Sequence, residues 1–289
     1  MDIAGAASRW FDEHARDLPW RRPDATAWGI LVSEVMLQQT PVARVEPAWH
    51  AWLERWPTPV ALAQDPPAEA IRAWGRLGYP RRALRLHECA VAIVARHAGV
   101  VPDGVDALLA LPGIGAYTAR AVAAFAYRQR QPVVDTNVRR LLARAVDGRA
   151  DAGPATTAGD LATVLALLPE PGVAAARASV AFMELGALLC TARSPRCHEC
   201  PLWKSCAWRL AGSPAGTGPR RRPQRYTGTD RQVRGLLLAV LRESTVPVPR
   251  TRLDLVWPEH VQRARALAGL VDDGLVTALP GERYALPAG

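Results

Sequence analysis

Four of the five cysteines lie in one short segment, and their spacing constrains the fold more than any other feature of the sequence. Cys190, Cys197, Cys200 and Cys206 fall within 17 residues in the pattern C-x6-C-x2-C-x5-C. Four thiolates this close in sequence can surround one compact metal centre. Zinc modules usually pair two CxxC-type knuckles well apart, whereas here one CxxC is flanked by two single cysteines. The pattern therefore favours a [4Fe–4S] cluster, and a zinc site is the alternative.

The charge balance favours a polyanionic partner. The chain has 289 residues, 36 Lys+Arg against 27 Asp+Glu, and a net charge of +9. Only one of the basic residues, Lys204, is a lysine, so a mechanism that needs a lysine Schiff base has a single side-chain candidate. No apolar run reaches the roughly 18 residues that cross a bilayer, and the N-terminus lacks a signal-peptide core. We therefore expect a cytoplasmic protein with no membrane partner.

Hydrophobic periodicity predicts an all-α body up to about residue 210. Segments such as WGILVSEVMLQQ and RALRLHECAVAIVARH place apolar residues three and four apart, and Pro and Gly separate them. Residues 211–228 are rich in Gly, Pro and Arg and are typical of a basic linker. Residues 229–289 then predict helices followed by a hairpin, which suggests a small winged-helix-like module. Such a module either contacts DNA or packs against the main body.

The segment LLALPGIGAYTARAVAAF predicts two helices joined by a tight turn. Gly113 and Gly115 permit close approach of a partner to the backbone, and the N–H groups at the following helix start, near Thr118, suit a phosphate. The alternative is a purely structural αα-hairpin. In a basic chain with a basic cysteine loop, phosphate binding is the better interpretation.

Two acidic residues, Glu34 and Asp135, are candidate catalytic residues. Glu34 lies in a predominantly apolar helix, where a carboxyl group has a raised pKa and could act as a general acid. The alternative interpretation is that Glu34 lies on a solvated polar face of the helix with Ser33 and Gln38. Asp135 directly precedes the helix of VVDTNVRRLLARA, where it could be no more than an N-cap.

Taken together, these segments resemble the HhH–GPD DNA glycosylases. The resemblance rests on L-P-G-I-G followed by an aspartate about 20 residues on, and on the cysteine loop of the endonuclease III branch. Within that branch the chain is similar to adenine DNA glycosylases of the MutY type over about residues 5–210. The segments that carry the similarity are DLPWR, SEVMLQQTPVARV, WGRLGYPRRALRLH, LPGIGAYTARAVAAFAY, VVDTNVRR and MELGALLCTARSPRCHECPLWKSCAW.

The resemblance implies a fold, a reaction and a set of site residues. Residues 1–20 and 130–210 would form an iron–sulfur helical domain, and 21–129 a six-helix barrel domain with the helix–hairpin–helix. Glu34 would protonate adenine at N7 and later activate water, while Asp135 would stabilise the oxocarbenium ion at C1′. Tyr117 and Asn137 would position the reacting groups. The expected base pocket and wedge residues are Trp20, Arg21, Leu37 and Glu184, with Gln39 and Tyr79 entering the vacated stack.

The expected substrate is double-stranded DNA that contains an A:8-oxoguanine or A:G mispair, bound by a monomer in the bacterial cytosol or nucleoid. Bifunctional endonuclease III-type enzymes carry a lysine where this chain has Tyr117, so strong lyase activity is not expected. The rival interpretations are a thymine or uracil mismatch glycosylase and a non-catalytic iron–sulfur protein that binds DNA or senses redox state.

The sequence departs from the family pattern at three places. Pro80 stands where a second aromatic is common, and Thr136 replaces glycine in the D-G-N-V motif. Residues 229–289 look too short and too helical for the C-terminal domain that reads 8-oxoguanine in many members, and its F-S-H loop is absent. These departures leave open how the opposite base is read.

Overall fold

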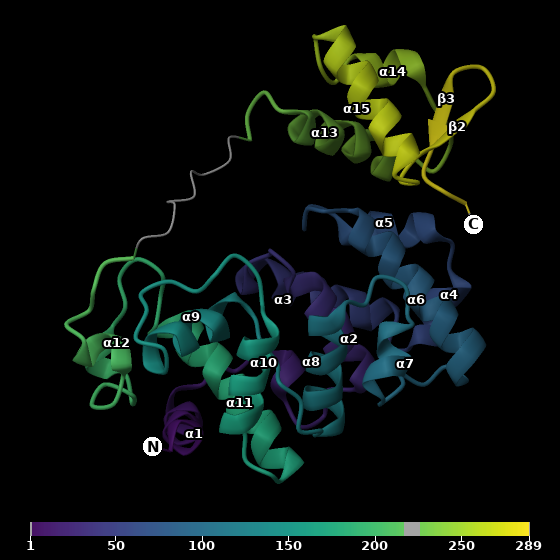
Figure 1. Cartoon of the computed structure of the whole chain (residues 1–289). Helices are drawn as coiled ribbons and strands as arrows, with labels where there is room; N and C mark the ends of the chain where they lie inside the picture. Colours follow the sequence, from purple (N-terminus) through teal and green to yellow (C-terminus); the bar gives the residue numbers. More distant parts are fainter. Residues whose placement is uncertain (1, 217–225, 289) are drawn as a thin grey trace. The chain divides into compact units, whose positions relative to one another are not determined.

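The computed structural model describes residues 2–216 and 226–288 (Figure 1). As predicted, the described chain is built almost wholly of helices, with one small sheet near the C-terminus. The body contains α1 (Ile3–His14), η1 (Pro19–Arg21), α2 (Ala27–Leu37), α3 (Val42–Arg55), α4 (Pro59–Gln64), α5 (Pro67–Trp74), α6 (Arg81–His97), α7 (Val105–Leu109), α8 (Ala116–Tyr127), α9 (Thr136–Ala145), α10 (Ala158–Leu167), α11 (Gly172–Leu188), η2 (Cys197–Glu199) and α12 (Ala207–Leu210).

The chain divides into two compact units. The first comprises residues 1–31, 103–109 and 114–220, and the second comprises 32–102, 110–113 and 221–289. Each unit therefore gathers segments that are far apart in the sequence. The boundaries expected from the family resemblance remain a prediction. In the described residues, no helix is both long and apolar enough to span a membrane.

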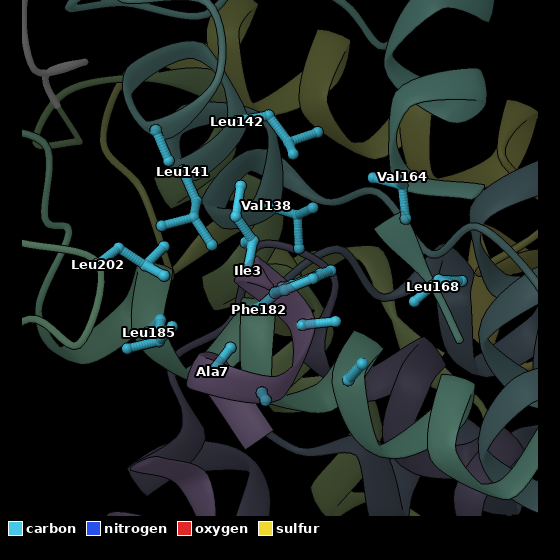
Figure 2. Close-up of a cluster of buried hydrophobic side chains, with 14 of the residues drawn as sticks. Ile3, Ala7, Val138, Leu141, Leu142, Val164, Leu168, Phe182, Leu185 and Leu202 are labelled. Carbon is cyan, nitrogen blue, oxygen red and sulfur yellow. The ribbon is translucent and has the colours of Figure 1, made fainter. Parts of the chain in front are cut away.

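The core of the first unit forms around α11, which packs against α1 and α9. Phe182 and Leu185 of α11 are 1% and 0% exposed and lie among Ile3, Val138 and Leu142 (Figure 2). Small residues on α11, including Ala175, Ala178 and Ala181, are also fully buried. Because alanine adds little bulk, this face of the helix lets its neighbours approach closely.

The second unit has a tryptophan-rich core. Trp52 at the end of α3 contacts Trp56 and Trp74 edge to face, with ring centroids 4.6 and 5.8 Å apart. All three rings are 1% exposed. Edge-to-face pairs of this kind add to the stabilisation that burial of the rings already provides.

The predicted C-terminal winged-helix-like module is confirmed. It consists of α13 (Asp230–Glu243), β1 (Val248–Pro249), α14 (Arg250–Asp254), α15 (His260–Asp272), β2 (Thr277–Leu279) and β3 (Arg283–Ala285). The strands form an antiparallel sheet of order β1-β3-β2, so β1 adds to the predicted hairpin. The short β1 was missed because two residues show no alternating pattern.

The module contacts the helical part of the second unit. Arg242 donates to the Ile71 carbonyl at 3.0 Å, and Arg72 donates to the Ser244 carbonyl at 2.5 Å. Asp273 pairs with Arg81 at 3.2 Å. These contacts show the packing that the sequence left open as one of two roles, and the DNA-contacting role stays a prediction. Four arginines of the predicted linker, Arg220, Arg221, Arg222 and Arg225, lie outside the described residues.

The core around α11 generates a stability prediction. Phe182→Ala should lower the free energy of unfolding by about 3–5 kcal/mol, because it removes a buried ring and leaves a cavity. Val173→Ala on the same helix is the control, since Val173 is 68% exposed. Denaturant unfolding followed by circular dichroism measures both variants. Equal losses of stability would contradict the packing described.

Candidate active site and metal centre

Asp135 caps α9 and is held by two hydrogen bonds. Its Oδ1 accepts from the Val138 backbone N–H at 2.7 Å, and its Oδ2 accepts from Asn137 Nδ2 at 2.8 Å. Burial raises the pKa of Asp135 above its usual value and outweighs these hydrogen bonds, which lower it. Asp135 is thus the N-cap that the sequence allowed, and its carboxylate is also locked in one orientation by Asn137.

A chain of hydrogen bonds continues from Asn137 toward the cysteine loop. Arg140 donates to Asn137 Oδ1 at 2.9 Å and to the backbone carbonyls of Gly186 and Cys190 at 2.6 and 2.5 Å. Gly186 allows this approach, because a Cβ there would lie 2.7 Å from Asn137. Sequence reasoning missed Arg140, because its two carbonyl partners lie 46 and 50 residues away.

Glu184 is fully buried and paired with two arginines. Arg16 donates to both carboxylate oxygens at 2.7 Å, and Arg21 donates to Oε2 at 3.0 Å. Burial alone would raise the pKa of Glu184, but these two partners outweigh it and lower the pKa to about 2. The predicted pocket residues Glu184 and Arg21 are therefore brought together, and Trp20, which precedes Arg21 in η1, is buried. Arg16 was not anticipated from the sequence.

Glu34 lies in α2 in the second unit and is only 6% exposed. Its neighbour Ser33 is fully buried. The alternative of a solvated polar face is therefore wrong. Leu37, the last residue of α2, is half-buried.

Gln39 and Tyr79, the predicted wedge residues, lie on two loops of the second unit. Both are exposed, Tyr79 by 49%. Both have left-handed backbone conformations, with φ of +57° and +48°. The structure therefore presents both side chains from sharply turned segments.

The helix–hairpin–helix turn forms as predicted between α7 and α8. Gly113 has φ of +77°, which favours glycine. A Cβ at this position would also lie 2.6 Å from the Arg85 side chain. Gly115 caps α8 with no side-chain hydrogen bond. Gly113 and Gly115 are exposed, Thr118 is buried, and Tyr117 packs beside Ala121 and Ala124.

The four clustered cysteines line a single pocket. Leu141, Leu189 and Leu202 form apolar walls around Cys190, Cys197, Cys200 and Cys206. The buried Arg144 donates to Cys190 Sγ at 3.5 Å. Within the described ranges, no three His, Cys, Asp or Glu residues are placed to hold a single metal ion. Four cysteine thiols are the ligand set that a [4Fe–4S] cluster uses, and all four line this pocket.

Comparison with known proteins decides the family. The adenine DNA glycosylase of Mycolicibacterium smegmatis is 64% identical over 96% of this chain and 93% of its own length. That of Mycobacterium tuberculosis is 60% identical over 96% of this chain and 91% of its own. The chain belongs to the adenine DNA glycosylases.

Family models and more distant relatives agree with this membership. The model of the HhH-GPD superfamily of base excision DNA repair proteins matches residues 32–164, and that of the iron-sulfur binding domain of endonuclease III matches 190–206. The human adenine DNA glycosylase is 39% identical over 70% of this chain and 38% of its own length.

Solved structures share the fold. A thermostable thymine-DNA glycosylase matches with a TM-score of 0.65 and 24% identity, covering 72% of this chain and 95% of its own. An endonuclease III trapped covalently on DNA matches with a TM-score of 0.62 and 22% identity, covering 73% and 95%.

The cysteine loop of this adenine DNA glycosylase family member is the binding site of a [4Fe–4S] cluster. Cys190, Cys197, Cys200 and Cys206 would ligate it. Such a cluster can cross-link its loop and, where its potential allows, exchange electrons.

Metal analysis tests the cluster directly. Purified protein should be brown and contain about four irons per chain when fully loaded. Cys197→Ser should lower the iron content, because it removes one of four ligands. Cys89→Ala is the control, since Cys89 is buried outside the pocket and should leave iron content unchanged. Zinc without iron in anaerobically prepared protein would refute the cluster.

The Glu184 ion pairs predict a pH dependence of stability. The pKa of Glu184 is lowered to about 2 in the folded protein. Ionised Glu184 therefore stabilises the folded state fully when the pH is above its unfolded-state pKa of about 4.3. That contribution is lost as the pH falls through about 2. Glu184→Gln should therefore lower the free energy of unfolding by about 3 kcal/mol at pH 7, and the difference should narrow below about pH 4.3.

Asp17→Asn serves as the control for Glu184→Gln. Asp17 pairs with Arg22 on the surface, where the two side chains are 74% and 49% exposed. An exposed pair contributes about 0–1 kcal/mol. Thermal melts between pH 3 and 7 would contradict the assignment if Glu184→Gln differed from wild type by the same amount at every pH.

Proposed function

We propose that this protein removes adenine mispaired with 8-oxoguanine or guanine from double-stranded DNA by base flipping and monofunctional hydrolysis of the N-glycosidic bond. The observation that carries the proposal is 64% identity to an adenine DNA glycosylase over 96% of the chain. The site residues inferred from the sequence then receive roles in this reaction.

Glu34 and Asp135 divide the chemistry. Glu34 protonates the flipped adenine at N7, which makes the base a better leaving group, and then activates a water molecule. Its burial in α2, where it is only 6% exposed, supports this role because it shields the carboxyl group from bulk water. Asp135 stabilises the positive charge at C1′, and Asn137 orients it through the 2.8 Å hydrogen bond.

The identity of residue 117, a tyrosine, favours hydrolysis of the N-glycosidic bond without cleavage of the DNA strand. A lyase reaction of the endonuclease III type needs an amine to attack C1′. This chain has tyrosine at that position, and its one lysine, Lys204, lies in the cysteine loop. Wild-type protein should therefore leave abasic sites that break only after alkali or heat.

DNA binding combines the hairpin with basic side chains. Exposed Gly113 and Gly115 leave the start of α8 open to a phosphate. The net charge of +9 supplies a sequence-independent attraction to DNA. A monomer suffices for this arrangement.

A panel of duplexes tests the proposed substrate. The protein is incubated with duplexes that contain A:8-oxoguanine, A:G, A:T, G:T or G:U, and strands are resolved with and without alkali. We expect alkali-dependent breaks at adenine opposite 8-oxoguanine and guanine. Preferential cleavage at G:T or G:U would establish a thymine or uracil mismatch glycosylase, and DNA binding without any cleavage would establish a non-catalytic protein.

Variants of the two carboxylates test the mechanism. Glu34→Gln keeps the side-chain volume but cannot supply the proton, so single-turnover release of adenine should fall by about 10²-fold or more while DNA binding persists. Asp135→Asn should also be severely impaired, because it removes the charge that faces the developing cation. Glu54→Gln, on an exposed position of α3, is the control. Release at the wild-type rate by either carboxylate variant would show that its role is wrongly assigned.

A further inference from the structure

Gln39 and Tyr79 adopt backbone conformations that residues other than glycine rarely occupy. Their φ angles of +57° and +48° lie in the left-handed region, where such residues are uncommon and each costs free energy. Both lie next to helix ends: Gln39 comes two residues after α2, and Tyr79 comes two residues before α6. The surrounding structure must therefore hold both residues in place.

Arg82 supplies contacts to both loops. Its Nη1 donates to the carbonyls of Val35, Met36 and Gln38 at 2.8, 2.9 and 2.7 Å, which closes the end of α2 directly before Gln39. Its Nη2 donates to Thr40 Oγ1 at 3.0 Å and to the Gly78 carbonyl at 3.1 Å, on either side of the two wedge residues. One guanidinium group therefore brackets Gln39 and touches the residue before Tyr79.

Ring contacts complete this connection. The Arg82 guanidinium lies 5.5 Å from the centroid of the Tyr79 ring and 5.1 Å from that of Trp74. Trp74 Nε1 donates to the Gly78 carbonyl at 2.9 Å, and Thr40 Oγ1 donates to the Leu77 carbonyl at 3.4 Å. The 38–40 and 77–79 loops are thus joined directly and through Arg82.

The chemistry of this position requires arginine. Burial lowers the pKa of Arg82 to about 10, so the side chain stays charged at neutral pH and interacts favourably with the C-terminal end of α2. Its planar fork reaches five acceptors from two nitrogens, whereas a lysine ammonium is a compact donor that cannot span them. None of the acceptors is a carboxylate, so the group serves the backbone of the loops and not a surface ion pair.

We propose that Arg82 is a positioning residue that holds Gln39 and Tyr79 as one preformed wedge, so that both enter the base stack together when adenine is extruded. The inference rests on the proposed function, which assigns the wedge to these two residues. It adds that base extrusion and opposite-base discrimination depend on Arg82. Arg82 acts on them indirectly, because its guanidinium group binds the two loops that carry Gln39 and Tyr79. A wedge ordered before binding loses less conformational entropy on entering DNA.

The test uses the full-length, cluster-loaded protein and compares extrusion with chemistry. Extrusion is followed by the fluorescence of 2-aminopurine placed opposite 8-oxoguanine, which rises when the base leaves the stack. Excision is measured in single turnover on A:8-oxoguanine and on adenine opposite an abasic site, where stacking resists extrusion less. Arg82→Lys should slow extrusion and A:8-oxoguanine excision by roughly tenfold, as expected for lost charge-assisted hydrogen bonds, and should slow excision opposite the abasic site much less.

Two variants keep the result interpretable. Thr40→Val removes one Arg82 acceptor and the bond to Leu77, and should shift extrusion in the same direction by less, even if Arg82→Lys proves poorly folded. Arg55→Lys is the control, because Arg55 also lies over a tryptophan ring, 4.4 Å from the centroid of Trp56, but pairs on the surface with Asp65 and Glu69. It should behave as wild type.

Combined variants separate failure of this inference from failure of the proposed function. If Arg82 acts through the wedge, adding Arg82→Lys to Gln39→Ala/Tyr79→Ala should cause little further loss. Additive losses, or equal losses on both excision substrates, would overturn the inference. If Gln39→Ala/Tyr79→Ala extrudes the base as wild type does, the wedge assignment itself fails, and absence of adenine release by the wild-type protein would refute the proposed function.

Discussion

The hydrogen bonds of Arg140 fix the geometry around Asp135 and Asn137 in the first unit. One guanidinium group joins Asn137 near the start of α9, the Gly186 carbonyl in α11 and the Cys190 carbonyl at the beginning of the cysteine loop. Asp135 is oriented by the same Asn137. The orientation of the carboxylate therefore depends on close contact between α9 and α11, which Gly186 permits.

Buried and half-buried arginines join remote segments of this chain in several places. Arg140, Arg144 and Arg82 each bind two or more backbone carbonyls from segments that are remote in sequence. A guanidinium group suits this task because it presents five donors in a fixed plane and remains charged when buried. The strong bias toward arginine in the composition thus has a structural use beyond attraction to DNA.

The C-terminal module uses its arginines differently. Arg263 and Arg265 of α15 pair with Asp254 and Asp230 at 2.8 and 2.7 Å. Arg242 is turned toward the carbonyl of Ile71. These side chains are engaged within the second unit, where they support the packing of the module. The expectation that linker arginines supply DNA affinity concerns residues outside the described range and stays a prediction.

The sequence by itself determined the helical fold, the iron–sulfur cysteine loop, the hairpin turn and the N-cap at Asp135. Each of these is a local property, because periodicity, cysteine spacing and capping act between residues that are close along the chain. The winged-helix module was also predictable, apart from the two-residue β1.

Only the tertiary structure decided how the functional side chains are supported. Glu34 proved to be buried and not part of a solvated face, and Glu184 proved to be an ionised acceptor between Arg16 and Arg21. Arg82 and Arg140 carry little local signal, because most of their partners lie 42 to 50 residues away. Burial and long-range hydrogen bonds arise when remote segments pack together, and a linear pattern does not encode which carbonyl a given arginine will meet.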